Sequence, residues 1–145
     1  MNNDLADLIK YAFEDTSNQL KTTELHILEL HEMVLFESLL SDIKKVFRRT
    51  VDNYAIIHTH NQHGQESREQ SRGQIAITKE DYLLIPNIVK SPDAIHLGEK
   101  SNIGTDLIQY EKEIDGVSYF YVEEVRKKRK SLSMKTLFKR KASTK

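Results

Sequence analysis

An Asp-Gly pair at 115–116, set between two runs of β-prone residues, constrains the fold of this chain more than any other feature. Asp-Gly favours the tight two-residue turn that joins antiparallel strands. The run before it, 107–114, carries leucine, isoleucine and tyrosine, and the run after it, 117–125 (VSYFYVEEV), is rich in aromatic and β-branched side chains. The sequence therefore predicts a β-hairpin here, and a further strand at 132–139 (LSMKTLFK).

Alternation along these strands predicts which side chains share a face. Glu124 and Arg126 are two residues apart, so they would be neighbours on the same face. In the last strand, one face would hold Leu132, Met134, Thr136 and Phe138, and the other Ser133, Lys135, Leu137 and Lys139.

The first part of the chain has a helical period instead. Apolar residues recur at helical spacing over 3–18 and over the longer segment 23–49. Three explanations of an amphipathic helix as long as the second stay open. It could cover a sheet, pack on the first helix, or form a homodimer with a second copy of the chain.

The middle of the chain predicts shorter elements. A third helix is expected over about 53–63, ending at Gly64. The next residues, 64–74, include no large apolar side chain and predict a loop. A short helix should start at Thr78, and Pro86 must interrupt or end it.

These elements predict an α+β fold, with N-terminal helices followed by an antiparallel β-meander of three to four strands. We divide the chain into an N-terminal helical segment at 1–50, a main domain at 51–141 and a basic tail at 142–145.

The composition limits the classes of protein that fit. A chain of 145 residues with 38% hydrophobic residues can build one modest core, and the absence of cysteine excludes disulfides and thiolate metal sites. No apolar stretch approaches the ~18 residues of a membrane span, and the N-terminus lacks a signal pattern. A soluble cytoplasmic protein is the simplest expectation.

The formal net charge of zero hides an asymmetry. Residues 1–45 hold nine acidic and four basic residues, whereas 126–145 hold ten basic residues and no acidic one. Such a division indicates an anionic partner at the C-terminal end, and a solvated tail is the alternative explanation for the last five residues.

Three of the six histidines lie in one run, His58, His60 and His63. The run resembles a zinc pattern of hydrolases, but Gln62 stands where that pattern has aspartate, so metal binding is disfavoured. On a helix His60 would face the core. His63 lies beside Gly64 and a polar loop, where it could reach a cleft or act as a C-terminal capping cation.

A second group of polar and aromatic residues lies on the predicted sheet. A carboxylate, a guanidinium and a hydroxyl beside a histidine could cleave RNA without a metal, because such groups move protons and hold the charge that builds on phosphate. The aromatic residues could stack on a base. The alternative is that these residues have no catalytic or binding role and only form a solvent-exposed face of the sheet. The group consists of Tyr119, Tyr121, Glu124, Arg126, Lys135, Thr136 and Lys139.

The segment from about Val51 to Lys141 resembles the phage-associated nucleases grouped with barnase, EndoU, colicin and RelE toxins, the BECR fold. Three stretches in order carry the resemblance: IIHTHNQHG, RGQIAITKEDYLLIPNIVKSPDAI and IQYEKEIDGVSYFYVEEVRKKRKSLSMKTLFKRK. It covers roughly the last two thirds of the chain.

This resemblance implies a metal-independent ribonuclease of phages and mobile elements, without cofactor, often a toxin or an effector domain delivered into a target-cell cytoplasm. RNA is the implied substrate, with tRNA one candidate, and a cognate immunity or antitoxin protein is an implied partner. Many relatives carry a basic residue where this chain has Asn61 or Gln62. The family's site residues fall on His58, His63, Glu124, Arg126, Thr136 and Lys139.

Our leading hypothesis is cleavage of RNA by transphosphorylation to a 2′,3′-cyclic phosphate. His58 and His63 would exchange protons, and Glu124 would act as base or orient Arg126. Thr136 would donate a hydrogen bond to the phosphate. Tyr119, Tyr121, Lys135 and Lys139 would bind substrate. This hypothesis requires both imidazoles to share one cleft with Arg126 and Thr136. The alternatives are a non-catalytic nucleic-acid-binding module and a protein-interaction module that uses the 23–49 helix.

Overall fold

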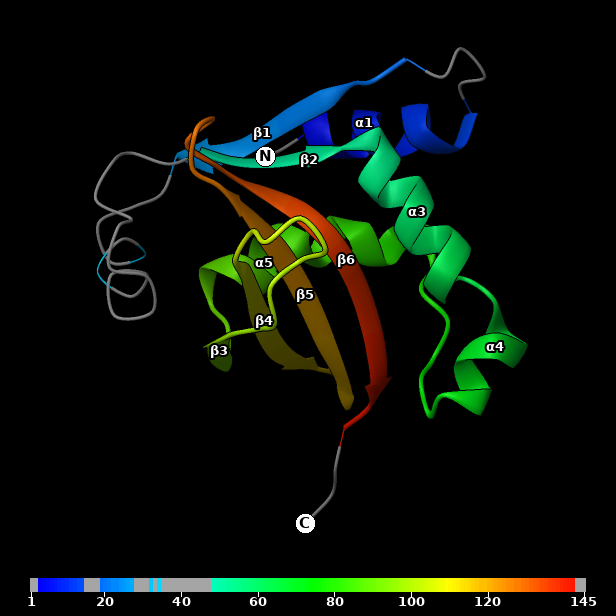
Figure 1. The fold of residues 1–145 in the computed structure, drawn as a ribbon. Coiled ribbons are helices and arrows are strands. Elements are labelled where there is room, and N and C mark those ends of the chain that lie inside the picture. The colour runs from blue at the N-terminus through cyan, green and yellow to red at the C-terminus, as the bar shows by residue number, and fades with distance from the viewer. Residues whose placement is uncertain (1–2, 15–18, 28–31, 33, 35–47, 143–145) are drawn as a thin grey trace.

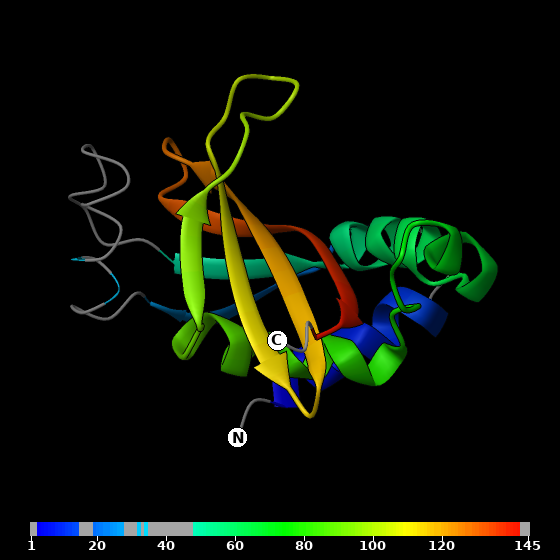
Figure 2. The same cartoon turned by 90° about the horizontal axis from the view of Figure 1, so that it is seen from below.

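The computed structural model describes residues 3–14, 19–27, 32, 34 and 48–142. Its strands form one six-stranded sheet in the order β1-β2-β6-β5-β4-β3 (Figures 1 and 2). The strands are β1 (Thr22–Ile27), β2 (Arg48–Asp52), β3 (Ala94–Leu97), β4 (Leu107–Ile114), β5 (Val117–Arg126) and β6 (Ser131–Lys141). The helices are α1 (Asn3–Glu14), α3 (Asn53–His63), α4 (Glu66–Ser71), the 3₁₀ helix η1 (Lys79–Leu84) and α5 (Ile85–Lys90).

The predicted hairpin is confirmed. Strands β4 and β5 pair antiparallel up to Ile114 and Val117, and the turn between them is Asp115-Gly116. Both turn residues have positive φ, 51° and 79°. This left-handed backbone gives the turn a twist that matches the twist of the strands, and glycine adopts it without strain.

The α+β class is correct, but the predicted sheet was too small. Strands β3 to β6 form an antiparallel meander, as expected. Two further strands extend the sheet, and β2 pairs with β6 in parallel, so the sheet is mixed. Strand β6 therefore lies inside the sheet along residues 131–133, where β2 covers its edge.

The predicted helix over 23–49 is wrong at both ends. Strand β1 occupies Thr22–Ile27, β2 begins at Arg48, and the two pair antiparallel. Pairing between strands outweighs the helical spacing of apolar residues, since local propensity is weaker than tertiary contacts. Apart from 32 and 34, residues 28–47 of that helix lie outside the described residues, and so does any dimer or partner contact that it would make.

The N-terminal third shares the sheet and the core with the rest of the chain. The boundary that we placed between residues 50 and 51 falls within β2. In the predicted helix 3–18, residues 3–14 form α1, and 15–18 are not among the described residues. Residues Leu5 and Leu8 of α1 are almost fully buried in the main core.

The core lies on one face of the sheet. Figure 2 shows α1, η1 and α5 beneath this face, with α3 beside β6. In the part of the chain that the structure describes, no helix crosses the other face, and the loop 98–106 lies over one end of it (Figure 1). The largest core side chains include Leu5, Leu8, Ile56, Tyr82, Ile85, Ile88, Tyr110, Tyr121 and Leu137.

A β-bulge in β6 changes which residues share a face. Val122 pairs with Thr136 and Glu123 pairs with Met134, so Lys135 is an extra residue in β6. One extra residue inverts the alternation that follows it. Our assignment of faces is therefore wrong beyond residue 134.

Beyond the bulge, Thr136 and Phe138 lie on the face that carries Glu124. Leu137 instead pairs with Tyr121 on the core face, whereas alternation alone places it on the opposite face.

Two short elements differ from the expectation for the middle of the chain. Within 64–74, predicted to be a loop, residues Glu66–Ser71 form α4. The helix at Thr78 is η1, which starts with a capping box between Thr78 and Asp81. The next helix, α5, begins at Ile85 with Pro86 in its first turn, where a proline fits a helix. Among the described residues, no helix is long and apolar enough to cross a bilayer.

Candidate active site

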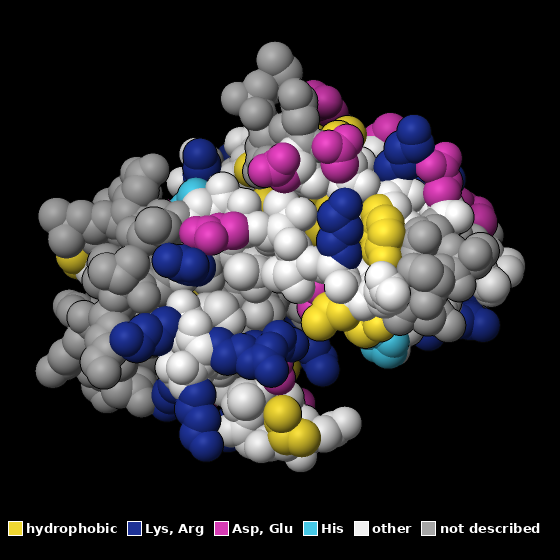
Figure 3. Space-filling model, turned by 90° about the horizontal axis from the view of Figure 1, so that it is seen from above, with side chains coloured by type: hydrophobic (Ala, Val, Ile, Leu, Met, Phe, Trp, Pro, Cys, Tyr) yellow, Lys and Arg dark blue, Asp and Glu magenta, His cyan; other side chains and the backbone are white. Residues whose placement is uncertain are grey.

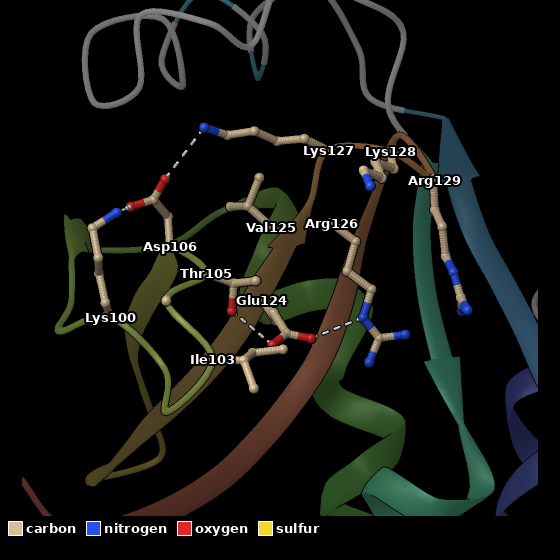
Figure 4. A pocket seen from close by; sticks show the side chains of 11 residues that line it. Lys100, Ile103, Thr105, Asp106, Glu124, Val125, Arg126, Lys127, Lys128 and Arg129 are labelled. Atoms are coloured by element: carbon tan, nitrogen blue, oxygen red, sulfur yellow. Dashed lines mark hydrogen bonds and ion pairs between the residues drawn. The ribbon is translucent and has the colours of Figure 1, made fainter.

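Two adjoining cavities form a groove at one end of the open sheet face, and both are lined by Glu124 and Arg126. The first, about 820 Å³, lies between the loop 98–106, the end of β5 and the turn at 127–129 (Figure 4). The second, about 400 Å³, lies between α3 and β6. Figure 3 shows the hollow, with Lys and Arg side chains on one side and an acidic side chain inside it.

Two hydrogen bonds fix the carboxylate of Glu124 in this groove. Arg126 Nε donates a hydrogen bond to Glu124 Oε1 at 2.8 Å, and Thr105 Oγ1 donates to Oε2 at 2.7 Å. Burial acts to raise the pKa of Glu124, but the hydrogen bonds from Arg126 and Thr105 outweigh it and hold the pKa below its ordinary value. Glu124 is therefore a carboxylate at neutral pH. The prediction that Glu124 and Arg126 are neighbours is confirmed.

The guanidinium of Arg126 is only partly engaged. Its side chain is 35% exposed, and its two terminal nitrogens make no hydrogen bond to the described residues. Figure 4 shows the group reaching away from the loop, toward β6 and α3. The edge formed by the two terminal nitrogens therefore remains for an anion, and a guanidinium can bind phosphate through two parallel hydrogen bonds.

His58 and Lys135 line the α3 side of the groove. Asp52 caps α3 by accepting a hydrogen bond from the Ala55 N–H at 2.8 Å, which fixes the start of the helix. His58 lies on the exposed side of α3, and Lys135 is exposed at the bulge. Neither side chain hydrogen-bonds to another described residue. The groove thus combines an imidazole, a carboxylate, a guanidinium and an ammonium group.

His63 does not line this groove, so the predicted convergence of two imidazoles is wrong. His58 and His63 are five residues apart, which separates them by about 140° around a helix. His63 Nδ1 instead lies 3.1 Å from the Glu69 carboxylate of α4, which is fully buried. The His63 ring also packs 5.6 Å from the ring of Phe138. These contacts tie α4 to the end of α3.

Thr136 also does not line either cavity. It lies on the same sheet face as Glu124, opposite Val122. Its hydroxyl is buried and has no hydrogen-bond partner within the described residues. The hydroxyl would have to be uncovered before it could reach a phosphate.

The packing role predicted for His60 agrees with its contacts. Its ring meets the ring of Phe13 edge-on at 4.7 Å, and the Tyr82 hydroxyl lies 3.4 Å from Nδ1. Burial, followed by the charge of Lys79, lowers the pKa of His60. Gly64 is needed beside it, because a Cβ there would lie 2.5 Å from the His60 carbonyl oxygen.

Three residues that we expected to bind substrate are engaged in packing. Tyr121 is fully buried in the core. Tyr119 donates a hydrogen bond from its hydroxyl to Asp81 at 3.1 Å, and Lys139 donates from Nζ to the same carboxylate at 2.7 Å. Burial acts to raise the pKa of Asp81, but the bond from Lys139 and other hydrogen bonds outweigh it and lower the pKa. The Asp81 cluster therefore joins η1 to the sheet.

A buried ion cluster behind the groove has no counterpart in our sequence analysis. Arg49 of β2 is fully buried and donates to Glu123 at 2.7 Å from Nε and to Glu32 at 2.6 Å from Nη1. It also donates to the Tyr110 hydroxyl at 2.9 Å. Burial acts to lower the pKa of Arg49, but Glu123 and the other partners raise it above its ordinary value. Since Glu123 precedes Glu124, this cluster holds the part of β5 that carries the groove.

Sequence reasoning also missed Thr105, which holds Glu124 from a loop. No local signal marks such a residue, since its role depends on where the loop folds. Among the described residues, no three histidine, aspartate or glutamate side chains gather as a set of metal ligands.

Comparison with known proteins assigns the class. The model of the family described as phage-Barnase-EndoU-ColicinE5/D-RelE like nuclease3 matches residues 26–145. The chain therefore belongs to this family of nucleases. The match begins at residue 26, near the end of β1, so it extends further toward the N-terminus than the segment in which we recognised the resemblance and includes all of β2. No curated protein and no solved structure matches the chain significantly.

Proposed function

We propose that the chain is a metal-independent endoribonuclease and that the groove is its active site. The observation that carries the proposal is that His58, Glu124, Arg126 and Lys135 line one cavity of about 400 Å³. These groups are sufficient for internal transphosphorylation of RNA, in which the 2′-oxygen attacks the phosphorus and the 5′-oxygen leaves. The product would be a 2′,3′-cyclic phosphate.

In this proposal Glu124 is the general base and His58 the general acid. Glu124 is ionised at neutral pH and lies in the groove, so it can accept the proton of the 2′-hydroxyl. His58 is an exposed imidazole across the groove, and in its protonated form it would give a proton to the leaving 5′-oxygen. Protons are thus removed at one side of the phosphate and supplied at the other.

Arg126 and Lys135 would hold the phosphate between these two groups. Negative charge builds on the non-bridging oxygens as the 2′-oxygen attacks, and cationic donors placed in advance stabilise it. The free terminal nitrogens of Arg126 suit two of these oxygens. We assign no chemical step to His63, because its Nδ1 is held by Glu69 outside the groove.

The test is cleavage of a mixed RNA substrate in EDTA, with detection of the cyclic phosphate. We expect His58→Ala and Glu124→Gln each to lower the rate by about 10²- to 10⁴-fold, the usual contribution of general acid–base catalysis. His96→Ala is the matched control, since His96 is an exposed histidine on β3, away from the groove. Equal rates for the wild type and His58→Ala, or no cleavage of several RNAs, would refute the proposal.

The toxin role implied by the resemblance has a separate test. If the enzyme cuts an essential cellular RNA, its expression should arrest growth, and Glu124→Gln should relieve the arrest at equal protein level. Arrest that persists in Glu124→Gln would show that it does not depend on this chemistry.

A further inference from the structure

The larger cavity of the groove has features that the proposed chemistry does not use. Ile103 lies at the tip of the loop 98–106 and is 81% exposed. Val125 lies behind this cavity but is only 2% exposed, and Lys128 and Arg129 lie in the turn that follows β5 (Figure 4). None of these four side chains is needed to move a proton or to hold the phosphate that is cut.

Ile103 is held out in water by an ordered loop. Within the loop, the Gly104 N–H donates to the Ser101 carbonyl at 2.9 Å, and the Thr105 N–H donates to Ser101 Oγ at 3.1 Å. Lys100 and Asp106 form an ion pair of 2.6 Å at its base. Exposing a large apolar side chain on a fixed loop costs free energy in water, so its burial by a ligand would be favourable.

The turn supplies positive charge at the edge of the same cavity. Lys128 and Arg129 are exposed and form no ion pair with the rest of the described chain. Lys100 and Lys127, by contrast, lie near Asp106, at 2.6 and 3.7 Å. Two cations therefore remain in the same cavity as the exposed side chain of Ile103, which suits a molecule with an apolar face and an anionic group.

We propose that this cavity binds one unpaired nucleotide of the RNA, next to the phosphate that is cut. The base would pack on Ile103, and the following phosphate would meet Lys128 and Arg129. The position of this nucleotide relative to the cleaved phosphate rests on the proposed function, whereas the binding of the nucleotide does not. At about 820 Å³ the cavity has the size of sites for small organic ligands.

The same geometry favours unpaired RNA over duplex. In an A-form duplex the faces of the bases are stacked on one another and cannot contact a side chain. Only a base that has left the stack can enter between the loop and β5. The protein should therefore select loops, bulges or single strands.

Binding can be tested without cleavage. A labelled 2′-O-methyl RNA heptamer has no free 2′-hydroxyl, so it is not cut, and its affinity is measured by fluorescence anisotropy as a single strand and as a duplex. We expect the wild type to bind the single strand at least about tenfold more tightly. Ile103→Ala should lower this affinity about fivefold to tenfold and leave duplex binding unchanged, because less apolar surface leaves water.

Two further variants test the charges and the fold. Lys128→Ala with Arg129→Ala should reduce the slope of log affinity against log salt by about 0.7, since the two residues together neutralise one phosphate and each neutralised phosphate of a single strand contributes ~0.7. Leu83→Ala is the matched control, because Leu83 is also an exposed apolar residue but lies on η1. It should bind both RNAs like the wild type. All variants replace exposed side chains, and equal melting temperatures would verify that they fold.

Several outcomes would overturn the proposal: equal affinity of the wild type for single strand and duplex, no effect of Ile103→Ala, or an equal effect of Leu83→Ala. A surface that binds an acidic protein instead would give the first two results. Failure of the proposed function can be distinguished from failure of this subsite. If the wild type cuts no RNA but Ile103→Ala still weakens single-strand binding, the subsite stands without the chemistry. If cleavage occurs at the same positions and with the same KM in Ile103→Ala, the chemistry stands without the subsite.

Discussion

Replacement of Glu123 by glutamine tests whether the buried ion cluster holds the sheet together. Glu123 and Arg49 are both fully buried and form two hydrogen bonds, of 2.7 and 3.2 Å. Tyr110 donates a third to the same carboxylate at 2.5 Å. A glutamine side chain has one acceptor oxygen, and its NH₂ group would face a donor N–H of Arg49. The change thus removes a charge and leaves a buried cation with fewer partners.

The size of the effect follows from what remains around Arg49. Breaking a buried ion pair by removing one partner costs about 3–5 kcal/mol. Glu32 still accepts from Arg49 at 2.6 Å, so we expect the lower end, about 3 kcal/mol. That is a large part of a total stability of about 5–15 kcal/mol. At roughly 2–4 °C per kcal/mol for a chain of this size, the melting temperature should fall by about 6–12 °C.

Urea unfolding followed by circular dichroism measures this loss, provided that the m-value stays constant. Glu113→Gln is the matched control, since Glu113 is an exposed glutamate on β4, and it should change stability by less than about 0.5 kcal/mol. A loss below about 1 kcal/mol for Glu123→Gln at unchanged m-value would refute the argument that Arg49 depends on this carboxylate.

Two further predictions concern packing contacts outside the groove. Lys139→Met should cost about 1.5–3 kcal/mol at pH 7, because a charged hydrogen bond to the buried Asp81 is lost. The folded-state pKa of Asp81 is lowered, so this stability is present above its ordinary pKa and disappears as the pH falls through the lowered value. Urea unfolding at pH 7 and near pH 2 should show the difference from wild type shrink, and a constant difference would contradict it. Gly64→Ala should lower the melting temperature, since its Cβ would lie 2.5 Å from the His60 carbonyl oxygen. Gly98→Ala, where a Cβ meets nothing closer than 3.5 Å, should change it little, and equal effects would contradict the reasoning.

Local signals in the sequence were enough for the elements that depend on neighbouring residues. The Asp115-Gly116 turn and the helix ending at Gly64 are examples, because turn geometry and helix ends are set within a few residues. Strands β1 and β2 were missed because each is defined by its partner, and the helical spacing of apolar residues outweighed their short β-prone stretches. No residue type marks the bulge at Lys135 either.

The candidate site could be predicted only where it depends on residues that are close together in the sequence. Alternation by two was enough to place Glu124 beside Arg126. The spacing of His58 and His63 implies different sides of a helix, so their separation follows from helix geometry and the sequence alone. Thr105 could not be found in this way, since it reaches Glu124 from 19 residues away in the chain through a loop whose path depends on the whole fold.

The extra residue in β6 determines where the length of this strand can vary. Deleting Lys135 would restore simple alternation and leave Thr136 opposite Val122 and Leu137 opposite Tyr121, so every later side chain would keep its face. Inserting a residue between Thr136 and Leu137 would instead turn Leu137 out into water and the ring of Phe138 into the hydrocarbon interior. Natural variants of this strand should therefore lose a residue at the bulge more readily than they gain one beyond it, and a sequence alignment that places a single-residue gap at position 135 is consistent with the fold.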